Sequence, residues 1–319
     1  MKSKPLLCGI DVSQLTLDVC YNDKFDKLHT IQVKNNTNGH NSLIKKLGIK
    51  RTYVIESTGI YSLQLCVKLK KAGADVRVEN SLVIKRFIQM NMERHKSDKR
   101  DAKWIYIYGK EREAAVWHMP QKEQFYCSQL MSGIELCTRN ITIINNSIKS
   151  YEKHPFINKD VRTSLTQILH KTEKELKKLD KKLEMQLDKW NGDLKRNLGT
   201  IPSLGKRAIA FLIIYTDGFT KITNARKLIA LAGTSPREFT SGTSVSSHKG
   251  ICKMGYSKLR KTLYMCSLTA IKCNQPCKEL YERLKAAGKP SKVALIAVCN
   301  KLLRQAFAIA TKGTTFQPS

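Results

Sequence analysis

The chain has 319 residues, about twice the length of a typical single domain, which predicts two or three compact units. Hydrophobic residues make up 41% of it, with 17 glycines and 8 prolines, and this composition excludes a disordered, collagen-like or low-complexity protein. The 57 Lys and Arg against 26 Asp and Glu leave a formal net charge of +31. Because such an excess repels itself in a compact fold, we expect an anionic partner, with nucleic acid as the leading candidate.

Neither a membrane span nor a secretory signal is expected. The most strongly apolar run, 209–215, is far shorter than the roughly 20 residues of a spanning helix, and Asp11 interrupts the first apolar run. The ten cysteines lack the paired CxxC spacing of a zinc site, so we expect reduced thiols. Cys273 and Cys277 lie one helical turn apart without further ligands, so we assign them no metal. The expected location is the cytoplasm.

Residues 1–120 are predicted to form one α/β domain. Short β-rich runs and helical patterns alternate along it, with strands expected at 6–12, 17–21, 28–33, 52–56 and 74–79 and helices at 39–47 and 61–71. Asn22-Asp23 is a turn signal between two of the strands. This alternation favours a sheet covered by helices.

Four acids close elements of this domain: Asp11 and Glu56 follow apolar strands, and Asp98 and Asp101 are spaced to share one helix face. Carboxylates at strand ends gather at one edge of a sheet, and hard oxygen ligands suit Mg²⁺. A single acid of this kind is more often a helix cap or a surface charge. Four together favour a metal site.

At these residues the chain resembles the DEDD insertion-sequence transposases, a family that includes bridge-RNA-guided recombinases and Piv-type DNA invertases. The matching residues are Gly9-Ile10-Asp11-Val12-Ser13 with Asp18-Val19, Glu56-Ser57-Thr58-Gly59-Ile60-Tyr61, and Lys96-Ser97-Asp98 with Asp101-Ala102. Ser97 stands where a Thr is common in the family. The resemblance implies a RuvC-like domain of RNase H-type fold, in which Asp11, Glu56, Asp98 and Asp101 bind Mg²⁺ and act on DNA.

Residues 121–197 form a helical region with apolar residues three and four positions apart. The seam runs from Leu130 to Ile148 and again from Leu165 to Leu187. His154-Pro155 interrupts it, which predicts two antiparallel helices joined near that proline. We expect a coiled coil that serves as scaffold or dimerisation element.

Residues 198–319 are predicted to be a mainly α-helical C-terminal domain that faces nucleic acid. They hold 20 Lys and Arg against 4 Asp and Glu, a net charge of +16. A basic segment with Thr240-Ser241-Gly242-Thr243-Ser244 follows the helical run 225–232. On composition alone this is a flexible connector, although a serine beside glycine in basic surroundings can approach a phosphate.

The resemblance assigns this segment a role. This segment and the residues on both sides of it look like the C-terminal transposase domain of the same family. The matching residues are Leu231-Ala232-Gly233, Pro236, Ser241-Gly242, Gly250-Ile251, Lys253, Gly255 and Leu259-Arg260. It implies that Ser241 is the nucleophile that becomes joined to DNA. Ser244, Ser246 and Ser247 are nearby alternatives, but none precedes a glycine. Lys253, Lys258 and Arg260 are expected phosphate contacts, with a solvated helix face as the alternative.

The turn 201–205 with Ala208 resembles the helix-hairpin-helix element that opens this domain in the family, where backbone amides hold a DNA phosphate. Ser203 replaces its usual first glycine, so we expect a packing turn here.

Together these features predict a DNA recombinase that cleaves and rejoins strands. The resemblance implies a structured bridge RNA, a homo-oligomer, either a dimer or a tetramer, and action at the bacterial nucleoid, without a membrane partner. The alternative is a RuvC-like metal-dependent nuclease or Holliday-junction resolvase that forms no covalent intermediate. A third possibility is a decayed transposase that binds nucleic acid without catalysis, against which the four intact acids argue.

Overall fold

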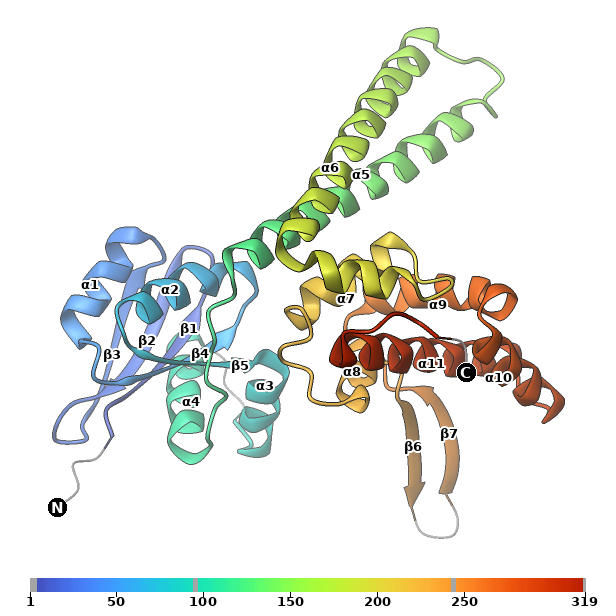
Figure 1. Ribbon diagram of the computed structural model, residues 1–319. Helices are drawn as coiled ribbons and strands as arrows, with labels where there is room; N and C mark the ends of the chain where they lie inside the picture. Colours follow the sequence, from blue (N-terminus) through green and yellow to red (C-terminus); the bar gives the residue numbers. More distant parts are fainter. Residues whose placement is uncertain (1–4, 94–96, 242–244, 318–319) are drawn as a thin grey trace. The chain divides into compact units, whose positions relative to one another are not determined.

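The computed structural model describes residues 5–93, 97–241 and 245–317, with the backbone alone for 238–241 and 245–249. The chain divides into two compact units, Met1–Met119 and Pro120–Ser319. The first unit holds the five-stranded sheet and the second holds the long helices (Figure 1). The three-part division expected from the sequence stays a prediction.

The first unit is an α/β domain built on one mixed five-stranded sheet. Its strands are β1 (Leu7–Val12), β2 (Thr16–Asn22), β3 (Leu28–Lys34), β4 (Thr52–Ser57) and β5 (Asp75–Asn80). The order across the sheet is β3-β2-β1-β4-β5. The first three strands pair antiparallel, whereas β4 runs parallel to β1 and β5 runs parallel to β4. The expected α/β class is therefore confirmed for this unit.

Helices cover both faces of the sheet (Figure 1). They are α1 (Thr37–Leu47), α2 (Ile60–Lys71), α3 (Ser81–Met90) and α4 (Asp98–Glu111). One face, with Ile10, Val19 and Ile55, packs in a core with Leu43 of α1 and Leu65 of α2. The opposite face packs in a second core against side chains of α3 and α4, among them Ile84 and Ile105. The predicted strands and both predicted helices agree with the structure within two residues, and α3 was not anticipated.

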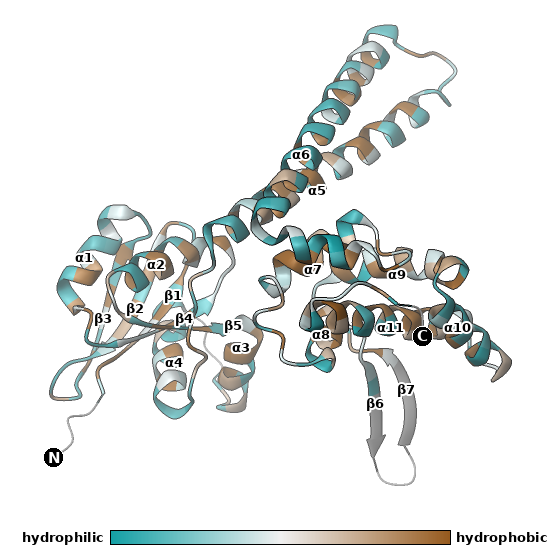
Figure 2. Cartoon of the chain, in the orientation of Figure 1, coloured by the Kyte–Doolittle hydropathy of each residue, from teal (hydrophilic) through white to brown (hydrophobic). Residues whose placement is uncertain are grey.

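The second unit is mostly helical. It contains α5 (Lys122–Tyr151), α6 (Lys159–Gly199), α7 (Lys206–Thr216), α8 (Ala225–Ala232), α9 (Ser257–Cys273), α10 (Gln275–Ala286) and α11 (Ser291–Lys312), with a two-stranded sheet of β6 (Pro236–Ser241) and β7 (Val245–Ile251). Figure 2 shows hydrophobic residues concentrated in α8 and α11, whereas α6 is mainly hydrophilic. The core of this unit draws side chains from each of the helices α5 to α11.

The long helices α5 and α6 form the expected helical pair, joined by residues 152–158. Their buried seam residues Ile134, Leu183 and Leu187 belong to the core of the unit. At Gly133 an added Cβ would lie 3.3 Å from Leu179 Cδ1, so the two helices approach closely there. Supercoiling into a coiled coil stays a prediction.

One helix of the described residues, α11, is long and apolar enough to cross a membrane by length and composition. It was not singled out from the sequence. The mean hydropathy of its most apolar window is 1.5, and 44% of that window is buried. Val298, Leu302 and Ala306 lie within the core of the second unit, which accounts for the apolar composition of the helix.

Candidate active site

The acidic site lies on the α4 side of the sheet, where strand register brings polar residues into one row. Asp11 is the Cα partner of Asp18, and Asp18 is the partner of Gln32. Ile10 pairs with Ile55 in the parallel ladder, so the next residues along, Asp11 and Glu56, are neighbours. Glu56 in turn pairs with Glu79. Because directly opposed residues point to the same face of a sheet, four carboxylates share this level.

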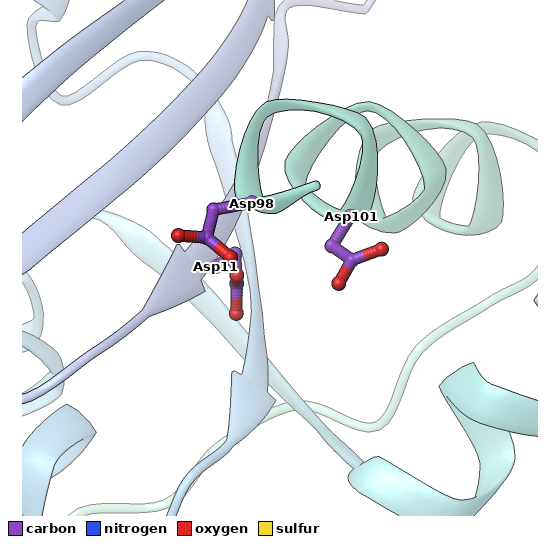
Figure 3. A group of neighbouring side chains, drawn as sticks. All are labelled: Asp11, Asp98 and Asp101. Carbon is purple, nitrogen blue, oxygen red and sulfur yellow. The ribbon is translucent and has the colours of Figure 1, made fainter. Parts of the chain in front are cut away.

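Helix α4 brings two further acids to this row. Ser97 caps the helix, with its hydroxyl accepting from the Arg100 amide, and Asp98 and Asp101 lie in the first turn. Carboxylates are favoured at this end of a helix because its free N–H groups carry partial positive charge. Asp11, Asp98 and Asp101 each present one carboxylate oxygen, and the three oxygens lie within 4.8 Å of one another (Figure 3).

Gly9 explains how α4 comes so near the sheet. A Cβ at this position would lie 2.2 Å from the Tyr106 amide nitrogen and 2.6 Å from the Ala102 carbonyl oxygen, so only glycine fits. Gly9 precedes Asp11 by two residues and therefore points to the same face of β1. The contact of α4 with Gly9 thus places the first turn of the helix beside Asp11.

The electrostatics of the row are those of a crowded acidic site. Burial raises the pKa of Asp11 to about 6, and the charges of Glu56, Asp101, Asp98 and Asp18 add to the rise. Asp18 is 3% exposed, and both of its carboxylate oxygens accept from Gln32 Nε2, at 3.1 and 3.0 Å. Repulsion of this kind is relieved when a cation binds, and an all-oxygen donor set suits a hard divalent ion.

The four predicted acids therefore fall in one region of the first unit. Three of them form the close cluster, and Glu56 adjoins it from β4 as a neighbour whose charge acts on Asp11. Asp18 and Glu79 were not predicted as site residues. The signal for Asp18 was a single acid inside the apolar run of its strand, and Glu79 is the penultimate residue of β5 as Glu56 is of β4.

Glu79 is held by a side chain of α4. Tyr108 donates its hydroxyl to Glu79 Oε2 at 2.7 Å, and burial followed by this hydrogen bond raises the pKa of Tyr108 to about 12. The phenol is therefore a donor at neutral pH. This bond ties the last turn of α4 to β5, the strand of the row that carries Glu79.

In the second unit, Ser241 ends strand β6, and its backbone pairs with Val245 of β7. Thr240 and Ser241, expected from composition to lie in a flexible connector, are thus paired residues of β6. Gly242 and Ser244 lie outside the described residues, as does Lys96 of the first unit's motif.

Gly233 and Gly255 lie where the β6–β7 hairpin joins the helices α8 and α9, which we call the base of the hairpin. Gly233 has φ +68° and ends α8. At Gly255, a Cβ would lie 2.4 Å from the Leu231 carbonyl oxygen, so the segment before α9 runs directly against α8. The Cys252 amide also donates to the Ser235 carbonyl at 2.8 Å. The motif residues of this unit therefore fix where the β6–β7 hairpin starts.

Two of the three predicted phosphate contacts already have partners within the chain. Arg260 donates to the carbonyl oxygens of Ala232, at 3.0 Å, and Lys253, at 3.4 Å. Lys258 forms an ion pair with Glu135 of α5. Lys253 is exposed and has φ +58°. A role in binding nucleic acid stays a prediction for all three.

Two family models match the chain. A transposase model of the DEDD IS110 type matches residues 8–126, and the model described as Transposase IS116/IS110/IS902 family matches residues 195–282. The "pilin gene-inverting protein" of Moraxella lacunata is 24% identical over 97% of this chain and 96% of its own length. The "Insertion element IS110 uncharacterized 43.6 kDa protein" of Streptomyces coelicolor is 24% identical over 38% of this chain and 29% of its own.

Among solved structures, Thermus thermophilus RuvC in complex with a Holliday junction substrate covers 36% of this chain with 100% of its own. The TM-score is 0.28 and the sequence identity 14%.

Proposed function

Because this chain belongs to the IS116/IS110/IS902 transposase family, we propose that it is a DNA recombinase that cleaves and rejoins strands with its acidic site and Ser241. The observation that carries the proposal is the cluster of Asp11, Asp98 and Asp101, whose oxygens lie within 4.8 Å. The similarity of this chain to the pilin gene-inverting protein, over 97% of the chain, supports DNA as the substrate.

The donor set fits a divalent metal. Asp11, Asp98 and Asp101, with Glu56 adjoining, offer only carboxylate oxygens, the ligands that Mg²⁺ prefers. Bound Mg²⁺ would neutralise phosphate charge and favour the ionised form of an attacking hydroxyl. The RuvC-like type of this domain belongs to the same proposal, supported by the family match to residues 8–126.

In the proposed reaction, Ser241 Oγ attacks the phosphorus of a DNA strand. The hydroxyl proton passes to solvent and a phosphoserine bond forms. The phosphorus–oxygen bond to the departing sugar breaks, and the sugar oxygen takes up a proton to become a hydroxyl. A sugar hydroxyl of the new partner strand then attacks the phosphoserine, which restores both the phosphodiester and the serine. The carboxylates of the acidic row supply the negative charge that a divalent metal site needs. The proposal also includes a guide of structured RNA, a homo-oligomer of two or four copies, and action in the bacterial cytoplasm.

Trapping of the covalent intermediate tests the serine. The full chain with its candidate guide RNA, labelled DNA and Mg²⁺ is expected to give a denaturation-resistant protein–DNA adduct whose peptide map contains Ser241. Ser241→Ala should bind DNA normally and form no adduct, whereas Ser246→Ala and Ser247→Ala should retain it. Cleavage without any adduct would instead support the metal-dependent nuclease or junction resolvase.

Substitution of the acids tests the metal site. Asp11→Ala, Glu56→Ala, Asp98→Ala and Asp101→Ala should each abolish recombination while DNA binding persists, since ligands of one site act as a unit. Asp193→Ala, at an exposed residue paired with Arg196 on α6, is the control and should recombine normally. Near-normal recombination by the Asp11 or Glu56 variant in Mg²⁺ would contradict the assignment.

A further inference from the structure

Asn35, at the corner between β3 and α1, joins two segments that follow residues of the acidic site, the loop after β1 and the first turn of α2. Its side-chain Nδ2 donates to the Ser13 carbonyl at 2.7 Å and to the Tyr61 carbonyl at 3.2 Å. Ser13 follows Asp11 by two residues, and Tyr61 follows Glu56 by five. One amide group therefore bridges the chain beyond β1 to the chain beyond β4.

The chemistry of the partners fixes the orientation of this amide. Two carbonyl oxygens can be satisfied only by the NH₂ group, so Oδ1 faces the other way, where His40 Nε2 lies 2.8 Å from it. His40 Nε2 must then carry a proton and donate. The histidine is 1% exposed, and burial followed by the Lys68 charge lowers its pKa, so the neutral ring serves as this donor.

The corner that carries Asn35 is itself fixed. An added Cβ at Gly39 would lie 1.9 Å from the Lys34 carbonyl oxygen, so the first turn of α1 presses on the end of β3. The Asn35 amide also donates to the Leu15 carbonyl at 2.8 Å. Lys68 Nζ donates to the Thr37 carbonyl at 2.9 Å and ties α2 to α1.

The loop after Glu56 needs such support. It passes through Gly59, with φ +68° and ψ −125°, a conformation that suits glycine, before α2 begins. Ser81 holds one end of it, donating its hydroxyl to the Ser57 carbonyl at 2.6 Å. Asn35 holds the other end through Tyr61.

We propose that Asn35, oriented by His40, is a positioning residue that keeps Asp11 and Glu56 in register for the divalent ion. This inference rests on the proposed function, because it assumes that these acids bind a metal. Partners that orient metal ligands typically change metal affinity about 10–100-fold when removed.

The test combines Mn²⁺ titration with amide hydrogen exchange on the full chain. Asn35→Ala should weaken Mn²⁺ binding about tenfold and, in the metal-free protein, speed exchange at residues 13–15 and 57–62. His40→Gln, whose amide can still donate to Asn35, should keep most of the affinity. Asn22→Ala is the matched control, because Asn22 also bridges backbone groups, accepting from the Leu7 amide and donating to Pro5, at the opposite end of β1.

Unchanged exchange at both loops in Asn35→Ala would overturn the inference, as would an equal loss of Mn²⁺ affinity in Asn22→Ala. A failure of the unmodified chain to bind Mn²⁺ would count against the proposed function instead. The exchange measurement would then still decide whether Asn35 braces the two loops.

Discussion

Among single residues, Asp11 shows how a crowded acidic site lowers the stability of the metal-free protein. Its pKa of about 6 lies above the ordinary value of 3.8, first because of burial and then because of neighbouring carboxylates. The folded state therefore disfavours the ionised form. The resulting destabilisation is full above pH 6, shrinks as the pH falls and vanishes below the unfolded pKa.

Asp11→Asn should accordingly stabilise the metal-free protein at pH 7.5. We expect a gain of about 1–2 kcal/mol in the free energy of unfolding, less than the full shift implies because the carboxyl is partly exposed to solvent. The gain should shrink at pH 4.5. Chemical denaturation in EDTA at both pH values measures it, with Asp193→Asn as the surface control. A loss of stability at pH 7.5 would show that another group compensates the Asp11 charge.

Ser203 is a second residue at which sequence and conformation disagree. It has φ +80°, a conformation that favours glycine, and its buried hydroxyl oxygen lacks a hydrogen-bond partner among the described residues. The turn between α6 and α7 thus keeps the backbone shape of a glycine while carrying a side chain. Ser203→Gly should raise the free energy of unfolding by about 1 kcal/mol, because the strain of the Cβ is lost.

Ser203→Ala separates the two causes. It removes the hydroxyl and keeps the Cβ, so the difference between the two variants measures the backbone term in thermal or chemical unfolding. Equal stability of Ser203→Gly and Ser203→Ala would mean that the hydroxyl, not the left-handed backbone, carries the cost.

At the scale of helices and strands, the hydrophobic patterns predicted the sheet well. The short apolar runs of β1, β2 and β4, each bounded by polar residues, are strong local signals. Asp11 and Glu56, each near the end of an apolar strand, lie on neighbouring strands, and Asp98 and Asp101 share the first turn of α4. What the patterns could not give is register: Asp18 and Glu79 join the row only because of which residues pair across strands.

The second unit was harder to predict for a physical reason. The hairpin that carries Ser241 is a two-stranded sheet rich in serine and threonine, so its strands lack the apolar alternation that marks a buried sheet. The hydrogen bonds of Arg260 to the Ala232 and Lys253 carbonyls were likewise not predictable, since they depend on the tertiary fold.

The close contact between β1 and α4 at Gly9 can be tested by substitution. Gly9→Ala should lower the free energy of unfolding by about 3 kcal/mol, because the methyl group would overlap the backbone of α4 at Tyr106. Mn²⁺ binding should weaken as well, since α4 carries Asp98 and Asp101. Gly199→Ala, at a glycine with open space around its Cβ position, should leave both unchanged. Normal Mn²⁺ affinity in a folded Gly9→Ala protein would show that the acids do not depend on this contact.

At the scale of the whole molecule, the net charge of +31 is the dominant property. Binding to DNA or RNA should release counterions from phosphates, so the logarithm of the association constant should fall linearly with the logarithm of salt concentration. Six contacted phosphates would give a slope of about −5 on B-DNA. A nearly salt-independent association constant would mean that the charge serves another purpose.

The lysines of the second unit differ in how available they are to phosphates, and salt titration of variants can distinguish them. Lys258 is paired with Glu135, whose side chain is only 18% exposed, so the charge of Lys258 is already compensated within the chain. Lys253 is exposed beside the base of the β6–β7 hairpin. Lys253→Gln should therefore reduce the steepness of the salt dependence by about one unit, as expected for one lost phosphate contact. Lys258→Gln should leave the slope nearly unchanged and lower stability slightly. The reverse result, with Lys258 carrying the slope, would mean that the pair with Glu135 opens when nucleic acid binds.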